Sequence, residues 1–380
     1  MKNYRQRFID FYNQFKCDDL YVTMTTTVEN SPWHRETNTA VHTDMVVSEY
    51  LSRTDFVWQK DHLKGALACA FHDVGKPGAK TVHNTPERGE HFKFLEHELL
   101  STRLFEDYVV RNWSSMSEVL VAQDIYDIGW IIQHHLPYKI KQVDKVASLV
   151  NTLHFVLPQC PEVFGTVLKS DQYGRISDDH QQKKDDTQAW IDQFYGYNTF
   201  LITPIKNVNK DRPTLTILVG ASGSGKSTNV DSIQQIPFYS IPFSWDTWRL
   251  HDFPHPNQER TIGEAYEYAF NISCEDKQFF DRCLVRFVNM VKNKNNIVVD
   301  NMNLTEKSRK QFTAIASHHG YHIQYLMFPV SIEQLVQRGK LRSDRDIDCG
   351  AIINMFYRLT YPSISPRCHD VIVMDSNLIK

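Results

Sequence analysis

The feature that most constrains the fold is a glycine-rich segment in the second half of the chain. Gly220-Ala-Ser-Gly-Ser-Gly-Lys-Ser227 follows the short apolar run Thr214–Val219 and matches G-x-x-x-x-G-K-[ST]. Glycines let backbone N–H groups close around phosphate oxygens, and a following helix adds partial positive charge. We therefore predict a site for ATP or another nucleoside triphosphate with Mg²⁺. Its residues are Gly220, Ala221, Ser222, Gly223, Ser224, Gly225, Lys226, Ser227 and Thr228. The alternative is a plain glycine-rich turn that binds no phosphate.

The residues around this segment predict an α/β domain. The runs Asn296–Val299 and His322–Phe328 are further candidates for buried strands. Helical patterns separate them, at Thr261–Phe270, Glu275–Val291 and Thr305–Ser317. Strands that alternate with helices imply a parallel sheet with both faces covered.

The first half of the chain has a different pattern, because apolar residues recur there at helical spacing and no run alternates as a strand would. The expected helices are His42–Leu51, Lys64–His72, His97–Val110, Ile125–His134, Pro161–Tyr173 and a last one near Ala189–Tyr197. We predict an all-α bundle over residues 1–205, followed by the α/β domain over residues 206–380. The boundary is expected between the polar run Ser177–Thr187 and Lys210–Pro213.

Composition excludes several classes of protein. The 380 residues are 41% hydrophobic and 23% charged, which is typical of a globular chain of two domains. The apolar runs are too short to span a bilayer, and the N-terminus lacks an apolar signal core, so we expect no membrane partner. Seven cysteines without a C-x-x-C pair predict reduced thiols in a cytoplasm, that of a host if a phage encodes the chain. The net charge of −3 means that contact with nucleic acid needs a local basic site.

Three short motifs follow the glycine-rich segment in order. Asp246 and Arg249 lie in Ser-Trp-Asp-Thr-Trp-Arg, Asp300 starts Asp-Asn-Met-Asn after the second strand, and Arg338 and Arg342 follow the third. This order resembles the 5′-hydroxyl polynucleotide kinase family of phage and bacterial end-healing enzymes. The resemblance implies a P-loop, a D-x-x-R acceptor motif, a strand ending in D-x-x-N, and an R-x-x-x-R lid.

The resemblance also implies a role for each residue. Lys226 would contact the outer phosphates, Ser227 would bind Mg²⁺, and Asp246 would be the general base on the attacking 5′-OH. Arg249 would contact the neighbouring phosphate of the acceptor, and Arg338 and Arg342 the transferred one. Asp300 would order the Mg²⁺ shell or the sheet end. Structural alternatives stay open: Asp246 as a helix N-cap, the two lid arginines as a solvated helix face with Arg345 replacing either, and Trp245 and Trp248 as packing residues or stacking platforms.

The first half contains a second constellation, built around adjacent His72 and Asp73 with Gly75 and Lys76 just beyond. His42 lies upstream, and His97, His134, His135 and Asp171 lie downstream. The pattern H…HD…H…H…D resembles the HD-superfamily phosphohydrolases. Imidazoles and carboxylates from separate helices can converge as a metal site inside a bundle.

For this half, the resemblance implies that His42, His72, Asp73 and Asp171 hold one divalent transition metal, from among Mn, Fe, Co, Ni and Zn. His97 with His134 or His135 would hold a second metal, with Asp73 bridging, and we prefer His134. Lys76 would neutralise a phosphate oxygen. His62, His83, His91 and His154 are expected to be surface or structural residues.

Together the two halves resemble the HD-Pnk type of nucleic-acid end-healing enzyme. The resemblance implies a 5′-OH kinase and a phosphatase acting on RNA or DNA ends with a 2′,3′-cyclic phosphate or a 2′- or 3′-phosphate. A separate ligase would then seal the ends, because the chain has no K-x-D-G motif. Two alternatives remain: a nucleotide phosphohydrolase fused to a nucleoside or sugar kinase, and an ATP-dependent nucleic-acid-binding module on a non-catalytic HD scaffold.

Overall fold

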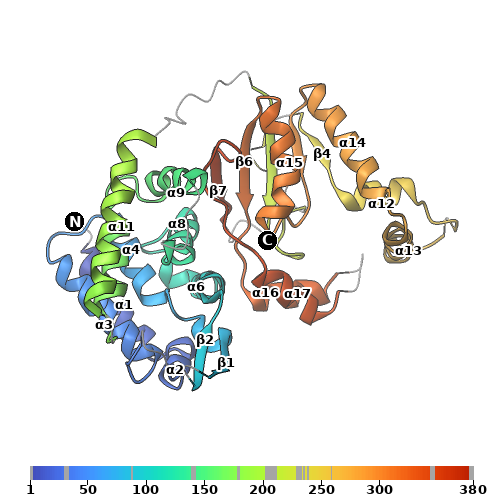
Figure 1. Cartoon of the computed structure of the whole chain (residues 1–380). Helices are drawn as coiled ribbons and strands as arrows, with labels where there is room; N and C mark the ends of the chain where they lie inside the picture. Colours follow the sequence, from blue (N-terminus) through green and yellow to red (C-terminus); the bar gives the residue numbers. More distant parts are fainter. Residues whose placement is uncertain are drawn as a thin grey trace. The chain divides into compact units, whose positions relative to one another are not determined.

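The computed structural model describes residues 3–375, except 30–33, 87–88, 138–142, 178–179, 202–211, 228–232, 234–235, 238, 258 and 343–346. The chain divides into two compact units, residues 1–203 and 204–380 (Figure 1). Within the described residues, no helix is long and apolar enough to cross a membrane. All seven cysteines are free thiols.

The first unit is helical, as predicted, apart from one hairpin. Its helices are α1 (Tyr4–Phe15), α2 (Asp19–Thr25), α3 (Thr39–Arg53), α4 (Lys60–Phe71), α5 (Lys76–Ala79), α6 (His97–Arg111), α7 (Trp113–Met116), α8 (Ala122–Gln133), α9 (Val143–Val156), α10 (Glu162–Tyr173) and α11 (His180–Leu201).

Helix α4 lies at the centre of this unit. Its residues Asp61–Phe71 are all buried, because small and apolar side chains face every direction along the helix. It packs against α1, α3, α8 and α10. Phe71 at its end contacts Phe15 and Tyr108, so an aromatic cluster closes the core beside the turn that follows. The central helix thus holds His72 and Asp73 at a rigid position.

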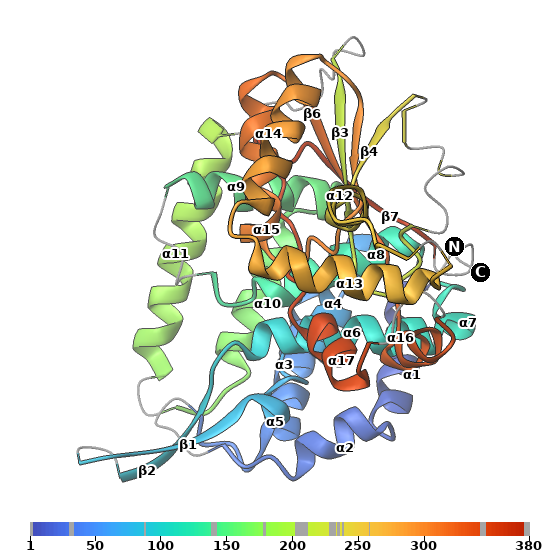
Figure 2. The same cartoon turned by 90° about the vertical axis from the view of Figure 1, so that its right-hand side faces the viewer.

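An antiparallel hairpin, β1 (Lys80–Thr85) and β2 (Gly89–Phe94), corrects the prediction of an all-α bundle. The hairpin extends away from the helices of its unit (Figure 2). The sequence pattern of these two strands is only weakly typical of β-structure, because Val82 is 63% exposed and polar residues lie on both faces of the hairpin. Phe94, at the end of β2, leads directly to the start of α6.

The polar run near residue 180, one limit of the expected boundary region, is helical: helix α11 begins at His180 and continues through Thr187. Gln181, Gln182 and Gln188 donate hydrogen bonds to the aspartates four residues later, at 2.9, 2.9 and 2.6 Å. Such i, i+4 pairs stabilise a helix without an apolar stripe.

The second unit contains the expected parallel sheet. Its strands are β3 (Thr214–Val219), β4 (Ile241–Phe243), β5 (Ile297–Val299), β6 (His322–Met327) and β7 (Asp370–Val373), in the order β4-β5-β3-β6-β7. The helices are α12 (Trp245–Asp252), α13 (Ile262–Glu275), α14 (Phe279–Lys292), α15 (Glu306–His318), α16 (Ile332–Lys340) and α17 (Cys349–Tyr357). The sequence analysis missed the edge strand β7.

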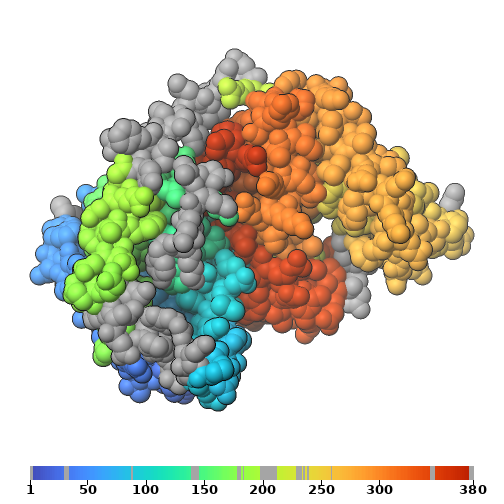
Figure 3. Space-filling model, in the orientation of Figure 1, coloured from blue at the N-terminus to red at the C-terminus, as the bar shows by residue number. Residues whose placement is uncertain are grey.

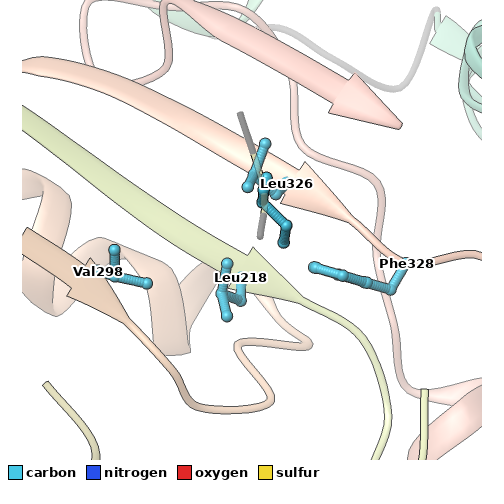
Figure 4. Packing of buried hydrophobic residues seen from close by; sticks show 5 residues of the cluster. Leu218, Val298, Leu326 and Phe328 are labelled. Carbon is cyan, nitrogen blue, oxygen red and sulfur yellow. The ribbon is translucent and has the colours of Figure 1, made fainter. Parts of the chain in front are cut away.

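The sheet core is formed by apolar residues on its central strands. Leu218, Val298 and Leu326 come from β3, β5 and β6, and they pack with Phe328 (Figure 4). Because all strands run in one direction, their carboxyl ends lie at the same edge of the sheet. The segments that follow β3, β4, β5 and β6 meet at that edge, where ligands of open parallel sheets bind.

Candidate active sites

The first candidate site lies where four helices of the first unit bring histidines to Asp73. His42 lies in α3, His72 caps the end of α4, His97 begins α6, and His135 follows α8. All four are buried, as is Asp73 itself. The Nε2 atoms of His42 and His72 lie 3.4 and 3.1 Å from Asp73 Oδ2. Those of His97 and His135 lie 3.1 and 3.9 Å from Asp73 Oδ1.

Each of these imidazoles is oriented by its other nitrogen. The Nδ1 atoms of His42, His72, His97 and His135 lie 3.0, 2.8, 2.7 and 2.8 Å from the backbone carbonyls of Gly174, Cys69, Phe94 and Ile132. With Nδ1–H donating to those carbonyls, each Nε2 presents its lone pair toward Asp73. This is the tautomer and orientation that protein ligands of transition metals adopt.

Asp171, in α10, completes the group from the opposite side. Its Oδ1 lies 3.2 Å from His42 Nε2 and 3.8 Å from His72 Nε2. Arg175 Nη2 donates to the same oxygen at 2.8 Å. Burial opposes the charged form of Asp171, but the positive charge of Arg175 holds the pKa of this carboxyl well below its usual range.

The structure separates the two adjacent histidines and favours His135 over the preferred His134. His134 Nδ1 contacts the carbonyl of Trp130 at 2.8 Å, and its ring lies 4.4 Å from the Trp130 ring. It is in no metal-ligand group among the described residues, whereas His135 forms one with Asp73 and His97. Burial lowers the pKa of both histidines, to about 4 for His134 and about 3 for His135, so both are neutral near pH 7.

Gly75 explains how the turn after Asp73 approaches α6. Its N–H donates to Ser101 Oγ at 2.9 Å. A Cβ at this position would lie 2.5 Å from the carbonyl oxygen of His97 and 2.6 Å from the backbone nitrogen of Ser101. Only glycine permits this contact, which sets the distance between Asp73 and His97.

Lys76 takes a different position from the one expected of a phosphate-binding residue. It is 4% exposed, and its Nζ lies 2.8 Å from Asp73 Oδ2 and 2.9 Å from Glu29 Oε2. Burial opposes the ammonium charge, but the two carboxylates raise the pKa of Lys76 above its ordinary value. The ammonium therefore balances buried carboxylates of the protein.

The sequence analysis missed three residues beside this group, namely Glu29, His34 and Glu36. His34 Nδ1 lies 3.4 Å from Glu29 Oε2 and from Glu36 Oε2. Glu36 Oε1 accepts a hydrogen bond from the backbone N–H of Ile176 at 2.7 Å. A histidine between two glutamates shortly before His42 was the available signal, but the Glu-His-Glu spacing matches no motif.

The buried atoms of the first site suit a divalent cation. Asp73 Oδ1, His97 Nε2, His34 Nδ1 and Glu36 Oε2 are buried and have no hydrogen-bond partner among the residues that the structure describes. Ligand atoms that share one first-row metal lie about 3.0–3.4 Å apart, since each is about 2.1 Å from the ion. Four buried carboxylates (Glu29, Glu36, Asp73 and Asp171) face two buried cations (Lys76 and Arg175), which leaves an excess of negative charge. The residues present therefore fit a transition metal with nitrogen and oxygen ligands.

The second candidate site is the P-loop at the end of β3. Gly223 and Gly225 have φ of 87° and 90°, which other residues rarely adopt. Lys226 is buried and its Nζ donates to the carbonyls of Gly220 and Ala221, both at 2.7 Å. Ser227 is exposed in a turn at the end of the loop, and Thr228 lies outside the described residues.

The motif that begins with Asp300 forms hydrogen bonds with the start of the P-loop and with the strands beside it. Asn303 Nδ2 donates to the carbonyls of Leu218 and Val299, at 2.8 and 3.3 Å, and so connects β3 with β5. The N–H of Gly220 donates to the carbonyl of Met302 at 3.1 Å. Asp300 continues the strand edge, since its N–H donates to the carbonyl of Phe243 at 2.9 Å.

Both lid arginines contact the P-loop. Arg338, in α16, donates from Nη1 to the carbonyl of Gly223 at 3.3 Å. Arg342 lies just beyond the C-cap of α16, and its Nη1 donates to Ser222 Oγ at 2.9 Å. These contacts argue against the alternative in which both arginines lie on a solvated helix face. Arg345, the other candidate, lies outside the described residues.

Asp246 and Arg249 form an ion pair at the start of α12. Arg249 Nη1 lies 2.7 Å from Asp246 Oδ1. Ser244 is the N-cap, because its side chain accepts the hydrogen bond from the N–H of Asp246, so the N-cap alternative for Asp246 is wrong. Trp245 packs against Phe243 and Phe312, and the Arg286 guanidinium lies 4.3 Å from the centre of the Trp248 ring. The segment from α12 to α13 lies at the surface of the second unit (yellow to orange in Figure 3).

Comparison with known proteins agrees with the P-loop interpretation. Residues 215–354 match the AAA domain family. Over 134 residues, the chain is 30% identical to "Putative bifunctional polynucleotide kinase/RNA ligase" of Autographa californica nuclear polyhedrosis virus. This match covers 34% of the chain and 18% of the viral protein, so the chain spans a small part of that relative. Residues 215–354 of the second unit, which include the P-loop, are therefore similar to AAA domains.

Two solved structures also show similarity. One is a chain of the Pnkp1/Rnl/Hen1 RNA repair complex, with 23% identity and a TM-score of 0.32, covering 42% of this chain and 50% of that one. The other, from a Pnkp1/Rnl/Hen1 complex, has 24% identity and a TM-score of 0.26, covering 35% of this chain and 41% of that one.

Proposed function

We propose that the chain is a bifunctional nucleic-acid end-healing enzyme. Its second unit would phosphorylate 5′-OH ends with ATP or another nucleoside triphosphate. Its first unit would remove a 2′,3′-cyclic phosphate or a 2′- or 3′-phosphate with a divalent metal. One observation carries the proposal: each unit holds a set of converging charged groups that suits one of these two reactions.

The kinase reaction follows from the groups at the carboxyl edge of the sheet. The 5′-hydroxyl oxygen attacks the γ-phosphorus while Asp246 accepts its proton. The bond from the γ-phosphorus to the bridging oxygen breaks, and the diphosphate leaves with that oxygen. Lys226 and the two lid arginines would stabilise the charge on the transferred group, because cations beside the developing charge lower its energy. Ser227 would hold Mg²⁺, which would neutralise charge on the phosphates.

A polynucleotide acceptor is supported by the arginine beside the base. A nucleoside or a sugar offers no phosphate next to its hydroxyl, so a guanidinium at 2.7 Å from the base would have no partner on it. A 5′-terminal nucleotide does offer that phosphate. The similarity to the viral protein named "Putative bifunctional polynucleotide kinase/RNA ligase" supports the same acceptor.

The phosphatase proposal depends on the histidine group around Asp73. His42, His72, Asp73 and Asp171 would hold one metal, and His97 and His135 a second, with the two oxygens of Asp73 shared between them. Such ions would polarise a phosphate and activate a water. The protein's own contribution is orientation, since four backbone carbonyls fix the imidazoles and Lys76 with Glu29 fixes Asp73. One divalent ion would balance the buried negative charge, and a second would leave a positive field for the substrate phosphate.

The experiment uses an oligonucleotide with a 5′-OH and a 2′,3′-cyclic phosphate, incubated with ATP and divalent metal, with each end analysed separately. Lys226→Ala or Asp246→Ala should abolish 5′ phosphorylation and preserve the phosphatase. His72→Ala or Asp73→Ala should do the reverse. If either pair of substitutions abolishes both activities while the protein remains folded, the assignment of one activity to each unit is wrong.

The other functions are distinguished by competition and by metal content. A nucleoside that competes as well as an oligonucleotide would show a small-molecule kinase instead. A purified chain without divalent metal and without hydrolysis would show that the first unit is a scaffold. RNA and DNA versions of the substrate, and joining by an added ligase, would identify the natural ends and the sealing partner. The cytoplasm remains the proposed location.

A further inference from the structure

One face of α13 contacts the catalytic pair of the proposed kinase. Tyr266, Phe270 and Ser273 are spaced by four and three residues, so they lie on the same side of the helix. Each of them contacts Asp246 or Arg249 of α12. None of the three belongs to the P-loop, the lid or the D-x-x-R motif.

Tyr266 fixes the carboxylate of Asp246. Its hydroxyl donates to Asp246 Oδ1 at 3.2 Å, and Arg249 Nη1 donates to the same oxygen at 2.7 Å. The side chain of Asp246 is 33% exposed, so without these donors it would exchange between rotamers in water. Two donors from two helices hold it in one orientation.

Ser273 and Phe270 fix the guanidinium of Arg249. Its Nε donates to Ser273 Oγ at 2.9 Å, and its central carbon lies 5.2 Å from the centre of the Phe270 ring. The rings of Phe279 and Phe280 lie 5.6 and 5.8 Å away. Nε and Nη1 are thus occupied, and Nη2 has no hydrogen-bond partner in the described part of the chain. The N–H groups of Nη2 are therefore the donors that we assign to a phosphate oxygen of the acceptor.

We propose that Tyr266 and Ser273 are positioning residues for the phosphate acceptor. Tyr266 orients the general base, and Ser273 orients the arginine that binds the first phosphate of the acceptor strand. The inference rests on the proposed 5′-kinase function. It assigns each of the two residues to a different step of the reaction. Tyr266 acts on proton removal, so it affects kcat. Ser273 acts on acceptor binding, so it affects KM.

The first test is Tyr266→Phe, which removes one hydroxyl and keeps the ring. Kinetics with a 5′-OH oligonucleotide should show kcat about tenfold lower, because a hydrogen bond to a charged group is lost. The KM values for ATP and for the oligonucleotide should not change. Tyr268→Phe is the matched control, since Tyr268 lies on the same helix and contacts the His255 ring, 4.8 Å away. It should behave like the wild type.

The second test is Ser273→Ala, measured with two acceptors. One has an ordinary phosphodiester as its first linkage, and the other has an uncharged methylphosphonate there. The KM for the first acceptor should rise about tenfold, whereas the KM for the second should not change. A merely structural role of Ser273 would alter both acceptors equally, and it would also raise the KM for ATP.

The outcomes separate this inference from the proposed function. A wild-type chain that phosphorylates no 5′-OH end overturns the function, and the inference with it. An active wild type with unchanged kinetics in Tyr266→Phe and Ser273→Ala overturns the inference alone. Equal losses for both acceptors, or a loss in Tyr268→Phe, would also overturn it. Thermal unfolding of each variant identifies a loss that is due to misfolding, and in that case Ser273→Cys, which keeps the size of the side chain but offers only a weak acceptor, replaces the alanine variant.

Discussion

Asp73 Oδ1 lies 3.1 Å from His97 Nε2, yet neither atom has a hydrogen-bond partner in the described part of the chain. With Nδ1–H donating to the carbonyl of Phe94, 2.7 Å away, the neutral ring of His97 has its lone pair on Nε2. Both atoms therefore present lone pairs in a buried space, which is costly unless a cation lies between them. This pair is the strongest structural indication that the first unit holds a metal.

The purified wild-type chain should accordingly contain at least one divalent transition metal per molecule, measured by elemental analysis after dialysis. Asp73→Asn should lower this content, because Asp73 contributes to both ligand groups. His62→Gln is a suitable control, since His62 is buried outside those groups and its Nδ1 accepts a hydrogen bond from the N–H of Gln59. Equal metal content in Asp73→Asn and the wild type would contradict the assignment.

His135→Ala should lower phosphatase activity by at least about 100-fold, because even residues behind a ligand affect activity by about 10–100-fold. His134→Ala should retain most of the activity, since its ring packs on Trp130 away from Asp73. Both variants should phosphorylate 5′ ends normally. The reverse ranking of the two histidines would restore the preference that the sequence suggested.

Gly75→Ala should reduce phosphatase activity by about tenfold or more, because its Cβ would push against the backbone of His97 and Ser101. Gly78→Ala is the matched control: its Cβ would meet only the flexible end of Leu100, at 2.8 Å. Thermal unfolding followed by circular dichroism reports whether each variant has remained folded. Similar phosphatase rates in the two variants would show that the approach of α6 does not set the site.

Acid should destabilise the end of α8 through His134. Its pKa is about 4 in the folded chain and about 6.5 when unfolded, so the unfolded state takes up the proton first as the pH falls. Stability from the neutral ring is complete above about pH 6.5 and is lost between about pH 6.5 and pH 4. Hydrogen exchange of the α8 amides at pH 7 and pH 5 measures this loss. His134→Gln should show a smaller difference, and an unchanged difference would exclude His134 as the cause.

Arg338→Ala and Arg342→Ala should each lower the kinase kcat by about 100-fold or more, because arginines on a transferred phosphate contribute strongly to its transition state. Arg338→Lys should not restore the rate, since an ammonium lacks the planar fork of guanidinium donors. Arg358→Ala, a variant at the C-cap of α17, serves as the control. Steady-state rates with saturating ATP and oligonucleotide decide between the expected loss and a solvated, dispensable pair.

Local patterns were enough to predict some elements. Thr214–Val219 and its glycine-rich loop identified the central strand and the phosphate site, because the strand, the turn and the lysine are adjacent in sequence. The adjacent His72 and Asp73 identified the turn after the buried helix α4 in the same way. The hairpin β1–β2 was missed, because its exposed faces carry little apolar alternation.

The sequence by itself determined which chemical groups the chain carries and the two types of unit that hold them, since hydrophobic period and motif spacing are local properties. Only the tertiary structure decided which groups meet. It placed His135 rather than His134 close to Asp73, and it brought Glu29 and Glu36 into the buried group of the first site. It also directed Lys76 toward carboxylates of the protein. It also brought Tyr266 and Ser273 of α13 onto the Asp246–Arg249 pair. These contacts join residues from different helices, and the packing of those helices, which no local pattern encodes, sets their distances.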